Sequence, residues 1–393
     1  SGIIVANVED VGGGWYRVSA TFNEVLSVVQ IYPKFNSTDV VSVTIQDAQL
    51  EIGLAASEVI ESGATTGKAG LLEDEPRFDY SGGATCPSLL LEPSRTNLIE
   101  YSEYFDGWTK IGSPTITTNY GISPDGSKNS TRFETTSDRI YIDVVSISAN
   151  ETFSVYMKGS GRVYLILGNT NNFNQVLTSE WQRYEFKTTQ AGTNNVIQIR
   201  ASGTAVDMEI WGAQFEQGSY PTSYIPNHSG TGSVTRGADD CSVTGVSSLI
   251  GQTQGTIFVD VNLKDNLDTS NIRGIFDIND GGTQNRISIY RGANDSNLYA
   301  VVFNNGNNEA AFVSYNTTGN VKIGLAYDST EIVFYINGSL VNSVSAAAVP
   351  LCSDVDLGII TNRADRVLGD SIKQALLFPT KLTATELATL TTL

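Results

Sequence analysis

The segment "IVFYINGSLVNSV", residues 332–344, predicts two β-strands joined by a tight turn. Asn337 and Gly338 separate two apolar, β-branched runs, and an Asn-Gly pair supplies the positive φ angles of a type I′ turn. Similar runs recur between Gly-, Asn- and Ser-rich stretches, for example "GTIFVDVNL" at 255–263 and "RVYLILGN" at 162–169. This pattern predicts an all-β protein of tandem antiparallel β-sandwiches.

One short helix is expected near the C-terminus. In "TKLTATELATL", residues 380–390, Thr383 stands three positions before Glu386. That spacing is typical of a capping box, in which each side chain bonds to the backbone N–H of the other residue. The helix therefore should begin just after Thr383.

Changes in composition divide the chain into five segments. The regions 97–225 and 248–393 alternate in strand fashion and predict two complete sandwiches, and 226–247 is a Gly-, Ser- and Thr-rich linker. The segment 61–96 is rich in Gly, Pro and charge but contains several large apolar residues. It is expected to be a connector that packs against its neighbours, because those apolar side chains need burial.

Residues 1–60 resemble the end of the domain at 97–225. "DAQLEIG" at 47–53 matches "GAQFEQG" at 212–218, and "WYRVSATF" at 15–22 matches "WQRYEFKT" at 181–188. The spacing between copies is far longer than the roughly 20–50 residues of a solenoid repeat, which favours a duplicated module. We therefore expect residues 1–60 to be the C-terminal half of a module like that at 97–225, with Trp15 matching Trp181 and Glu51 matching Glu216. The chain would then begin inside a module, as a fragment of a longer polypeptide would.

Charge and composition exclude several classes of partner. The net charge of −18 disfavours binding to nucleic acid and to anionic membrane surfaces. No stretch of about 18 apolar residues that could span a membrane occurs. Cys86, Cys241 and Cys352 are odd in number and far apart, so neither a disulfide framework nor a zinc site is indicated. They are expected to be small buried thiols or surface residues without a role.

No catalytic residues are predicted. A glycosidase on such a sandwich needs two carboxylates about 5–10 Å apart, and no strand carries the E-x-D-x-x-E pattern that would supply them. Asp207 and Glu209 share a strand face. Glu216, a third carboxylate of the same strand, recurs as Glu51 in the repeat, which favours a structural role for it over a catalytic one. His228 is the sole histidine, in a Gly-rich segment, which disfavours a nucleophilic triad.

Calcium is the one cofactor that the sequence suggests. Asp277, Asn279 and Asp280 cluster in "DINDGG", residues 277–282, and Asn294 and Asp295 follow in a later loop. Oxygen ligands on loops suit Ca²⁺. The same residue types also build ordinary turns, so turn chemistry remains the alternative.

Sugar binding requires aromatic rings for the apolar sugar faces and planar polar groups for the hydroxyls. Candidates in the region 97–225 are Tyr141, Tyr156 and Tyr164, and those in the region 248–393 are Tyr290, Arg291, Tyr299 and Asn304. For each of them, packing in the core or on the surface is the alternative. Trp15, Trp181, Trp211 and Trp108 are expected to be packed in cores.

Three stretches carry a family resemblance: "LLLEPSRTNLIEYSEYFDGWT" at 89–109, "SPDGSKNSTRFE" at 123–134 and "IWGAQFEQGSYPTSYIP" at 210–226. They resemble a carbohydrate-binding-module-like jelly roll of tailed-phage and prophage virion proteins. Residues 248–393 resemble the laminin-G-like, concanavalin A-like lectin domain that often follows that module.

The resemblance implies a tail or head fibre component on the virion, commonly a homotrimer. Its partners would be a host surface polysaccharide and other virion proteins. Three functions stay open: non-catalytic glycan binding, capsular polysaccharide depolymerisation, and a purely structural spacer or decoration role. A fold alone does not decide among them.

Overall fold

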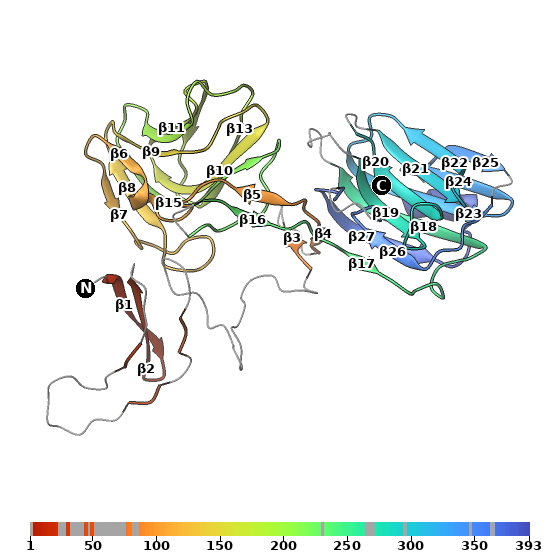
Figure 1. Cartoon of the computed structure of the whole chain (residues 1–393), viewed down its shortest axis with the longest axis horizontal. Helices are drawn as coiled ribbons and strands as arrows, with labels where there is room; N and C mark the ends of the chain where they lie inside the picture. Colours follow the sequence, from red (N-terminus) through yellow and green to blue (C-terminus); the bar gives the residue numbers. More distant parts are fainter. Residues whose placement is uncertain are drawn as a thin grey trace. The chain divides into compact units, whose positions relative to one another are not determined.

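The computed structural model describes residues 3–22, 29–31, 43–45, 48–50, 76–80, 86–228, 232–263, 272–293, 297–345, 348–361 and 366–393. The chain forms two compact units that are each discontinuous in sequence (Figure 1). Unit 1 comprises Ser1–Leu72, Asn97–Gln217 and Ser223–Val234, and unit 2 comprises Glu73–Thr96, Gly218–Thr222 and Thr235–Leu393. In the described part of the chain, no helix is long and apolar enough to cross a membrane.

The central part of unit 1 is a sandwich of two five-stranded antiparallel sheets. The first has the order β13 (Gln182–Lys187), β10 (Glu151–Ser160), β15 (Val206–Gln217), β8 (Thr131–Thr135) and β7 (Thr115–Thr117). The second has the order β12 (Asn171–Val176), β11 (Arg162–Leu167), β14 (Val196–Ala201), β9 (Arg139–Asp143) and β6 (Thr109–Ile111). Phe133, Phe153, Leu165 and Ile199, all 0% exposed, belong to the core between them. The predicted all-β sandwich fold is confirmed.

The sequence motifs of this sandwich meet in a buried polar network. Glu103 is 4% exposed, and its Oε1 and Oε2 accept hydrogen bonds from Tyr224 Oη at 3.0 Å and Asn129 Nδ2 at 3.1 Å. Asn129 Nδ2 also donates to Asp125 Oδ2 at 3.2 Å, and Ser102 Oγ lies 2.7 Å from Tyr224 Oη. The three quoted stretches thus share one hydrogen-bonded cluster, which fixes the loop at 118–130 and the segment around Tyr224 against the strands. The short 3₁₀ helix η2 (Phe105–Gly107) follows Glu103 directly.

The first part of unit 1 is a hairpin of β1 (Ile3–Gly12) and β2 (Trp15–Phe22). β2 occupies the stretch that the repeat aligns with β13. However, β1 pairs directly with β2, whereas the strand preceding β13, β12, lies in the opposite sheet from it. Trp15 is 43% exposed, so the expectation that it lies in a core is wrong for this structure, because among the described residues β1 and β2 form a sheet of two strands with no further strand. Glu51 lies outside the described residues.

Unit 2 is a sandwich of a six-stranded and a seven-stranded antiparallel sheet. The six-stranded sheet has the order β17 (Ser242–Val243), β26 (Asp354–Leu357), β19 (Arg273–Asn279), β20 (Arg286–Arg291), β21 (Leu298–Asn304) and β22 (Asn307–Ser314). The seven-stranded sheet has the order β25 (Ser339–Ser345), β24 (Glu331–Ile336), β23 (Gly319–Asp328), β18 (Gln254–Leu263), β27 (Ser371–Phe378), β4 (Ser88–Leu90) and β3 (Phe78–Asp79). β5 (Arg95–Asn97) and β16 (Val234–Arg236) form a separate two-stranded sheet.

Strands β3 and β4 come from the segment expected to be a connector, yet they extend the seven-stranded sheet: β4 pairs with β27, and β3 pairs with β4. Leu91, 4% exposed, belongs to the core of unit 2. Next to it, Glu92 accepts from Arg77 Nη1 at 2.7 Å and lies 3.0 Å from Arg236 Nη1, and Arg77 also pairs with Asp239. The described residues of this segment are therefore held in unit 2 by strand pairing, an apolar anchor and partly buried ion pairs.

Local features of unit 2 agree with the sequence. Between β24 and β25, Asn337 and Gly338 have φ angles of 49° and 80°, as a type I′ turn requires. The helix α1 (Ala384–Thr391) begins with the predicted capping box of Thr383 and Glu386. Leu387, 0% exposed, packs the helix against Ala326, Val333 and Tyr335. Cys352 is buried, Cys241 half-buried and Cys86 exposed, and all three are free thiols.

Candidate functional site

Two rows of side chains run across the outer face of the sheet β12-β11-β14-β9-β6 in unit 1. Each strand contributes one residue to each row. Residues that alternate with them, such as Ile140, Leu165 and Ile199, point into the core, because successive strand residues face opposite sides. The strand registers give a first row of Ile111, Arg139, Arg200, Tyr164 and Asn174, and a second row of Thr109, Tyr141, Gln198, Ile166 and Asn172. We call this surface the two-row face.

Two of the predicted sugar-binding tyrosines lie together on the two-row face. Tyr164 is 36% exposed and Tyr141 is half-buried. They stand on β11 and β9, which are separated by β14. Two strand spacings across the sheet and a two-residue step along it place their Cα atoms on the order of 10 Å apart. The two rings can therefore serve separate sugar units of one chain.

Planar polar groups flank both rings. Asn174 lies directly opposite Tyr164, and Gln198 lies directly opposite Tyr141. Asn172 and Asn174 are exposed, whereas Gln198 is buried and donates from Nε2 to Asn169 Oδ1 at 3.0 Å. Exposed amides beside aromatic rings can bond to hydroxyls while the rings contact the apolar sugar faces.

The arginines and amides of the two-row face were not predicted from the sequence. A signal was present, since "Arg-x-Tyr" occurs both at 139–141 and at 162–164. In a strand this spacing puts the Arg and the Tyr on one face. What the spacing could not show is that the two strands lie in the same sheet with only β14 between them.

Tyr156, the third candidate of this domain, lies on β10 in the opposite sheet. Its ring centroid is 5.4 Å from that of Trp211, and the Arg183 guanidinium lies 5.5 Å from it on the ring face. Trp211 is itself 5% exposed. Tyr156 is half-buried, and contacts with Trp211 and Arg183 leave less of its ring free for a sugar. Trp108 and Trp211 are buried, as expected, while Trp181 is half-buried beneath Lys158.

In unit 2, the structure pairs two candidates and separates the others. Tyr290 and Tyr299 face each other across β20 and β21, with ring centroids 5.3 Å apart and planes 11° from parallel. Arg291 is 1% exposed and lies 3.8 Å from buried Asp370, so it is an interior ion-pair residue. Asn304 is half-buried at the end of β21. Stacking of the two tyrosines uses one face of each ring and leaves less aromatic surface for a ligand.

The three predicted calcium ligands do not converge. Asp277 and Asn279 are 0% and 1% exposed on the six-stranded sheet, and Asp280 is exposed in the next turn. Asp280 accepts from Gly282 N at 2.9 Å and from Asn285 Nδ2 at 2.8 Å instead. Among the described residues, no group of three or more His, Cys, Asp or Glu side chains could hold a metal. Calcium binding there stays a prediction, and it would require Asp280 to turn toward Asp277.

A pair of carboxylates that no single strand revealed is formed across strands. Asp277 on β19 lies directly opposite Asp356 on β26. Asn279 Nδ2 donates to Asp356 Oδ2 at 2.9 Å, and Thr361 N donates to Asp277 Oδ2 at 3.2 Å. Burial raises the pKa of Asp277 to about 6. Asp277 is fully buried, Asp356 is 6% exposed, and both carboxylates accept hydrogen bonds from Thr361, so the pair anchors the backbone there.

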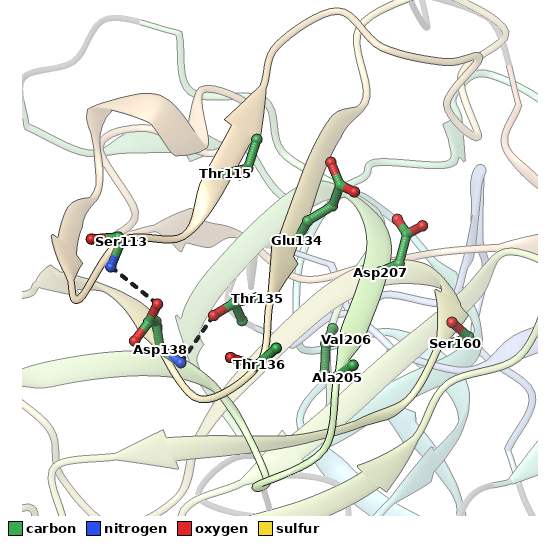
Figure 2. A pocket seen from close by; sticks show the side chains of 10 residues that line it. All are labelled: Ser113, Thr115, Glu134, Thr135, Thr136, Asp138, Ser160, Ala205, Val206 and Asp207. Atoms are coloured by element: carbon green, nitrogen blue, oxygen red, sulfur yellow. Dashed lines mark hydrogen bonds between the residues drawn. The ribbon is translucent and has the colours of Figure 1, made fainter.

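A separate polar cleft of about 450 Å³ opens at the edge of unit 1 (Figure 2). Its carboxylates already have partners. Asp207 receives two hydrogen bonds from Arg132, at 2.8 and 2.7 Å, which lower its pKa, and Asp138 accepts from Ser113 N at 3.0 Å. Hydroxyls such as Ser160 and Thr136 line the rest, and none of the described residues that line it is aromatic. The cleft therefore lacks the ring that a sugar platform requires.

Comparisons with known proteins show weak structural likenesses. No protein-family model matches the chain, and no curated protein matches it. The CBM40 domain of the Ruminococcus gnavus IT-sialidase is 16% identical over 39% of this chain and 97% of its own, with a TM-score of 0.31. The SAP-like pentraxin of Limulus polyphemus is 15% identical over 35% of this chain and 70% of its own, with a TM-score of 0.29. At these values the likenesses assign no function to this chain.

Proposed function

We propose that this chain is a non-catalytic glycan-binding protein and that the two-row face of unit 1 is its binding surface. The observation that carries the proposal is the placement of Tyr141 and Tyr164 on one outer sheet face, with exposed Asn174 directly opposite Tyr164 and exposed Asn172 in the row of Tyr141. A face with spaced rings and exposed amides suits an extended sugar chain, since rings contact sugar faces and amides bond to hydroxyls.

The sequence resemblance adds a biological location to the proposal. Residues 89–109, 123–134 and 210–226 resemble virion modules, so we propose a phage tail or head fibre component that binds a host surface polysaccharide. It would be exposed on the particle, associated with other virion proteins and assembled as a homotrimer. Light scattering on the purified chain tests the trimer, because a mass of 42.2 kDa would show a monomer.

Substitution of Tyr164 tests the binding surface. Tyr164→Ala removes a partly exposed ring without opening the core, so we expect glycan affinity to fall by about 1–2 kcal/mol with little change in the melting temperature. Binding to a glycan array, followed by titration calorimetry on the best ligand, measures the effect. Tyr156→Phe is the control, because Tyr156 lies on the opposite sheet and should not contact a ligand on the two-row face.

The outcomes separate the rival functions. Unchanged binding in Tyr164→Ala would show that the glycan binds elsewhere than on the two-row face. Absence of any glycan binding, combined with tight binding to a virion protein, would favour the spacer role. Reducing ends that accumulate in proportion to the purified chain would favour the depolymerase.

A further inference from the structure

The two-row face contains two arginines in direct opposition. Arg139 on β9 and Arg200 on β14 are partners in the strand register, and directly opposite side chains have Cβ atoms about 4.5–5.5 Å apart. Arg200 is exposed and Arg139 is half-buried. Among the described residues, no carboxylate forms an ion pair with either guanidinium. The strand register is the only relation that links either arginine to its described neighbours.

This opposition is unfavourable in the isolated protein. Like charges directly opposite each other destabilise a sheet. The chain has 42 acidic and only 24 basic residues, so carboxylates to neutralise the pair are plentiful in its composition. In the same unit, Arg132 is bound by Asp207 and lies 3.1 Å from Glu134, which shows how an arginine on a sheet face is otherwise compensated. Among the described residues no carboxylate compensates the pair on the two-row face in this way, and Arg162, exposed two residues before Tyr164, adds a third arginine nearby.

We infer that Arg139 and Arg200 select glycans that carry carboxylates, such as uronic or sialic acid residues. This inference rests on the proposed glycan-binding function of the two-row face. A guanidinium binds a carboxylate through two parallel N–H···O bonds, a geometry that a neutral hydroxyl cannot match. Tyr164 on β11 lies directly opposite Arg200 on β14, on the side away from Arg139. A sugar ring resting on Tyr164 can therefore direct its carboxylate toward the arginine pair.

The surroundings of the pair favour an acidic sugar over an acidic peptide. Tyr164 and Asn174 continue the same row, and Tyr141 and Asn172 lie in the second row. These groups offer ring faces and amides, which suit a ligand rich in hydroxyls. The arginines stand in the middle of a sheet, on strands paired on both sides, so an extended peptide has no free strand edge there to pair with.

The test uses the full chain on an array of neutral, uronic-acid-bearing and sialylated glycans, with poly-glutamate as a non-sugar polyanion. We expect signal on carboxylated glycans and at least tenfold less on their neutral or carboxyl-reduced counterparts. The double variant Arg139→Gln/Arg200→Gln should lose about 10- to 100-fold in affinity for the best carboxylated ligand. Lys128→Gln, which removes a charge from the loop before β8, should leave binding unchanged.

The melting temperature of the double variant gives an independent readout. Removal of a like-charge pair should leave it unchanged or raise it, and a fall of several degrees would show that the arginines serve the fold. Equal binding to neutral and acidic glycans would overturn the inference while leaving the proposed function standing. Binding to poly-glutamate as tight as to acidic glycans would overturn the inference as well. Binding to no glycan at all would overturn both.

Discussion

At the scale of single residues, Glu103 shows how much a buried ionisable group depends on its surroundings. Burial raises its pKa from 4.5 to about 7, although the hydrogen bonds from Tyr224 and Asn129 favour the charged form, and the nearby Asp125 carboxylate raises it further. The folded state therefore keeps this proton at pH values where the unfolded chain has released it. Stability that is present below pH 4.5 is lost as the pH rises to about 7.

We expect Glu103→Gln to remove most of this pH dependence. A pKa difference of this size corresponds to about 3 kcal/mol in the free energy of unfolding between pH 4.5 and 7.5. Urea denaturation of the wild type and the variant at both pH values measures it. The variant should gain stability relative to the wild type at the higher pH. An equal change in the free energy of unfolding between the two pH values in both proteins would contradict the assignment. Asp277 in unit 2, unchanged in both, contributes equally to each.

At the scale of elements, the conformation of a turn is determined by its own residues, whereas the pairing of distant strands is not determined locally. The Asn337–Gly338 turn and the Thr383–Glu386 cap depend on neighbours within a few positions, so the sequence predicted both. Arg139 opposes Arg200, and Asp277 opposes Asp356, only because strands far apart in the chain lie side by side in one sheet. Such registers are set by how two whole faces bury their apolar residues. The tyrosines could therefore be named in advance, whereas their shared face and its arginines could not.

The β24–β25 turn makes a test of its own. Gly338 has a φ angle of 80°, and a Cβ there would lie 2.9 Å from Thr392 Oγ1. Gly338→Ala should therefore lower the free energy of unfolding by about 1–2 kcal/mol, through left-handed strain and this contact. Thermal and urea denaturation measure the loss. Ser339→Ala, at an exposed position of β25, is the matched control and should change stability by less than about 0.5 kcal/mol.

At the scale of the whole molecule, the boundary of unit 2 does not coincide with the linker at 226–247. The unit also contains Glu73–Thr96 and Gly218–Thr222. Arg95 and Gly218, which flank the long segment of unit 1, lie together, since a Cβ on Gly218 would lie 2.8 Å from Arg95 Nη2. The chain thus leaves unit 2 and returns to it at nearly the same point, so the sandwich of unit 1 is an insertion in unit 2.

Two fragments of unit 2 should behave differently for this reason. Residues 248–393 alone lack β3, β4 and Leu91, which leaves an edge of β27 unpaired and part of the core uncovered, so we expect aggregation and a lowered melting temperature. Residues 73–96 joined by a short Gly-Ser linker to residues 218–393 should melt cooperatively and stay monodisperse. Calorimetry and gel filtration compare the two, and equal stability would show that the β3–β4 segment contributes little.

The insertion also sets an order of events during synthesis on the ribosome. β4 ends at Leu90 and its partner β27 begins at Ser371, about 280 residues later. At translation rates of about 5–20 residues per second, β4 waits roughly 15 to 60 s for that partner. All the strands of the unit 1 sandwich are made within this interval. The inserted sandwich can thus fold while unit 2 is still being translated, and the seven-stranded sheet of unit 2 is completed only after β27 has emerged.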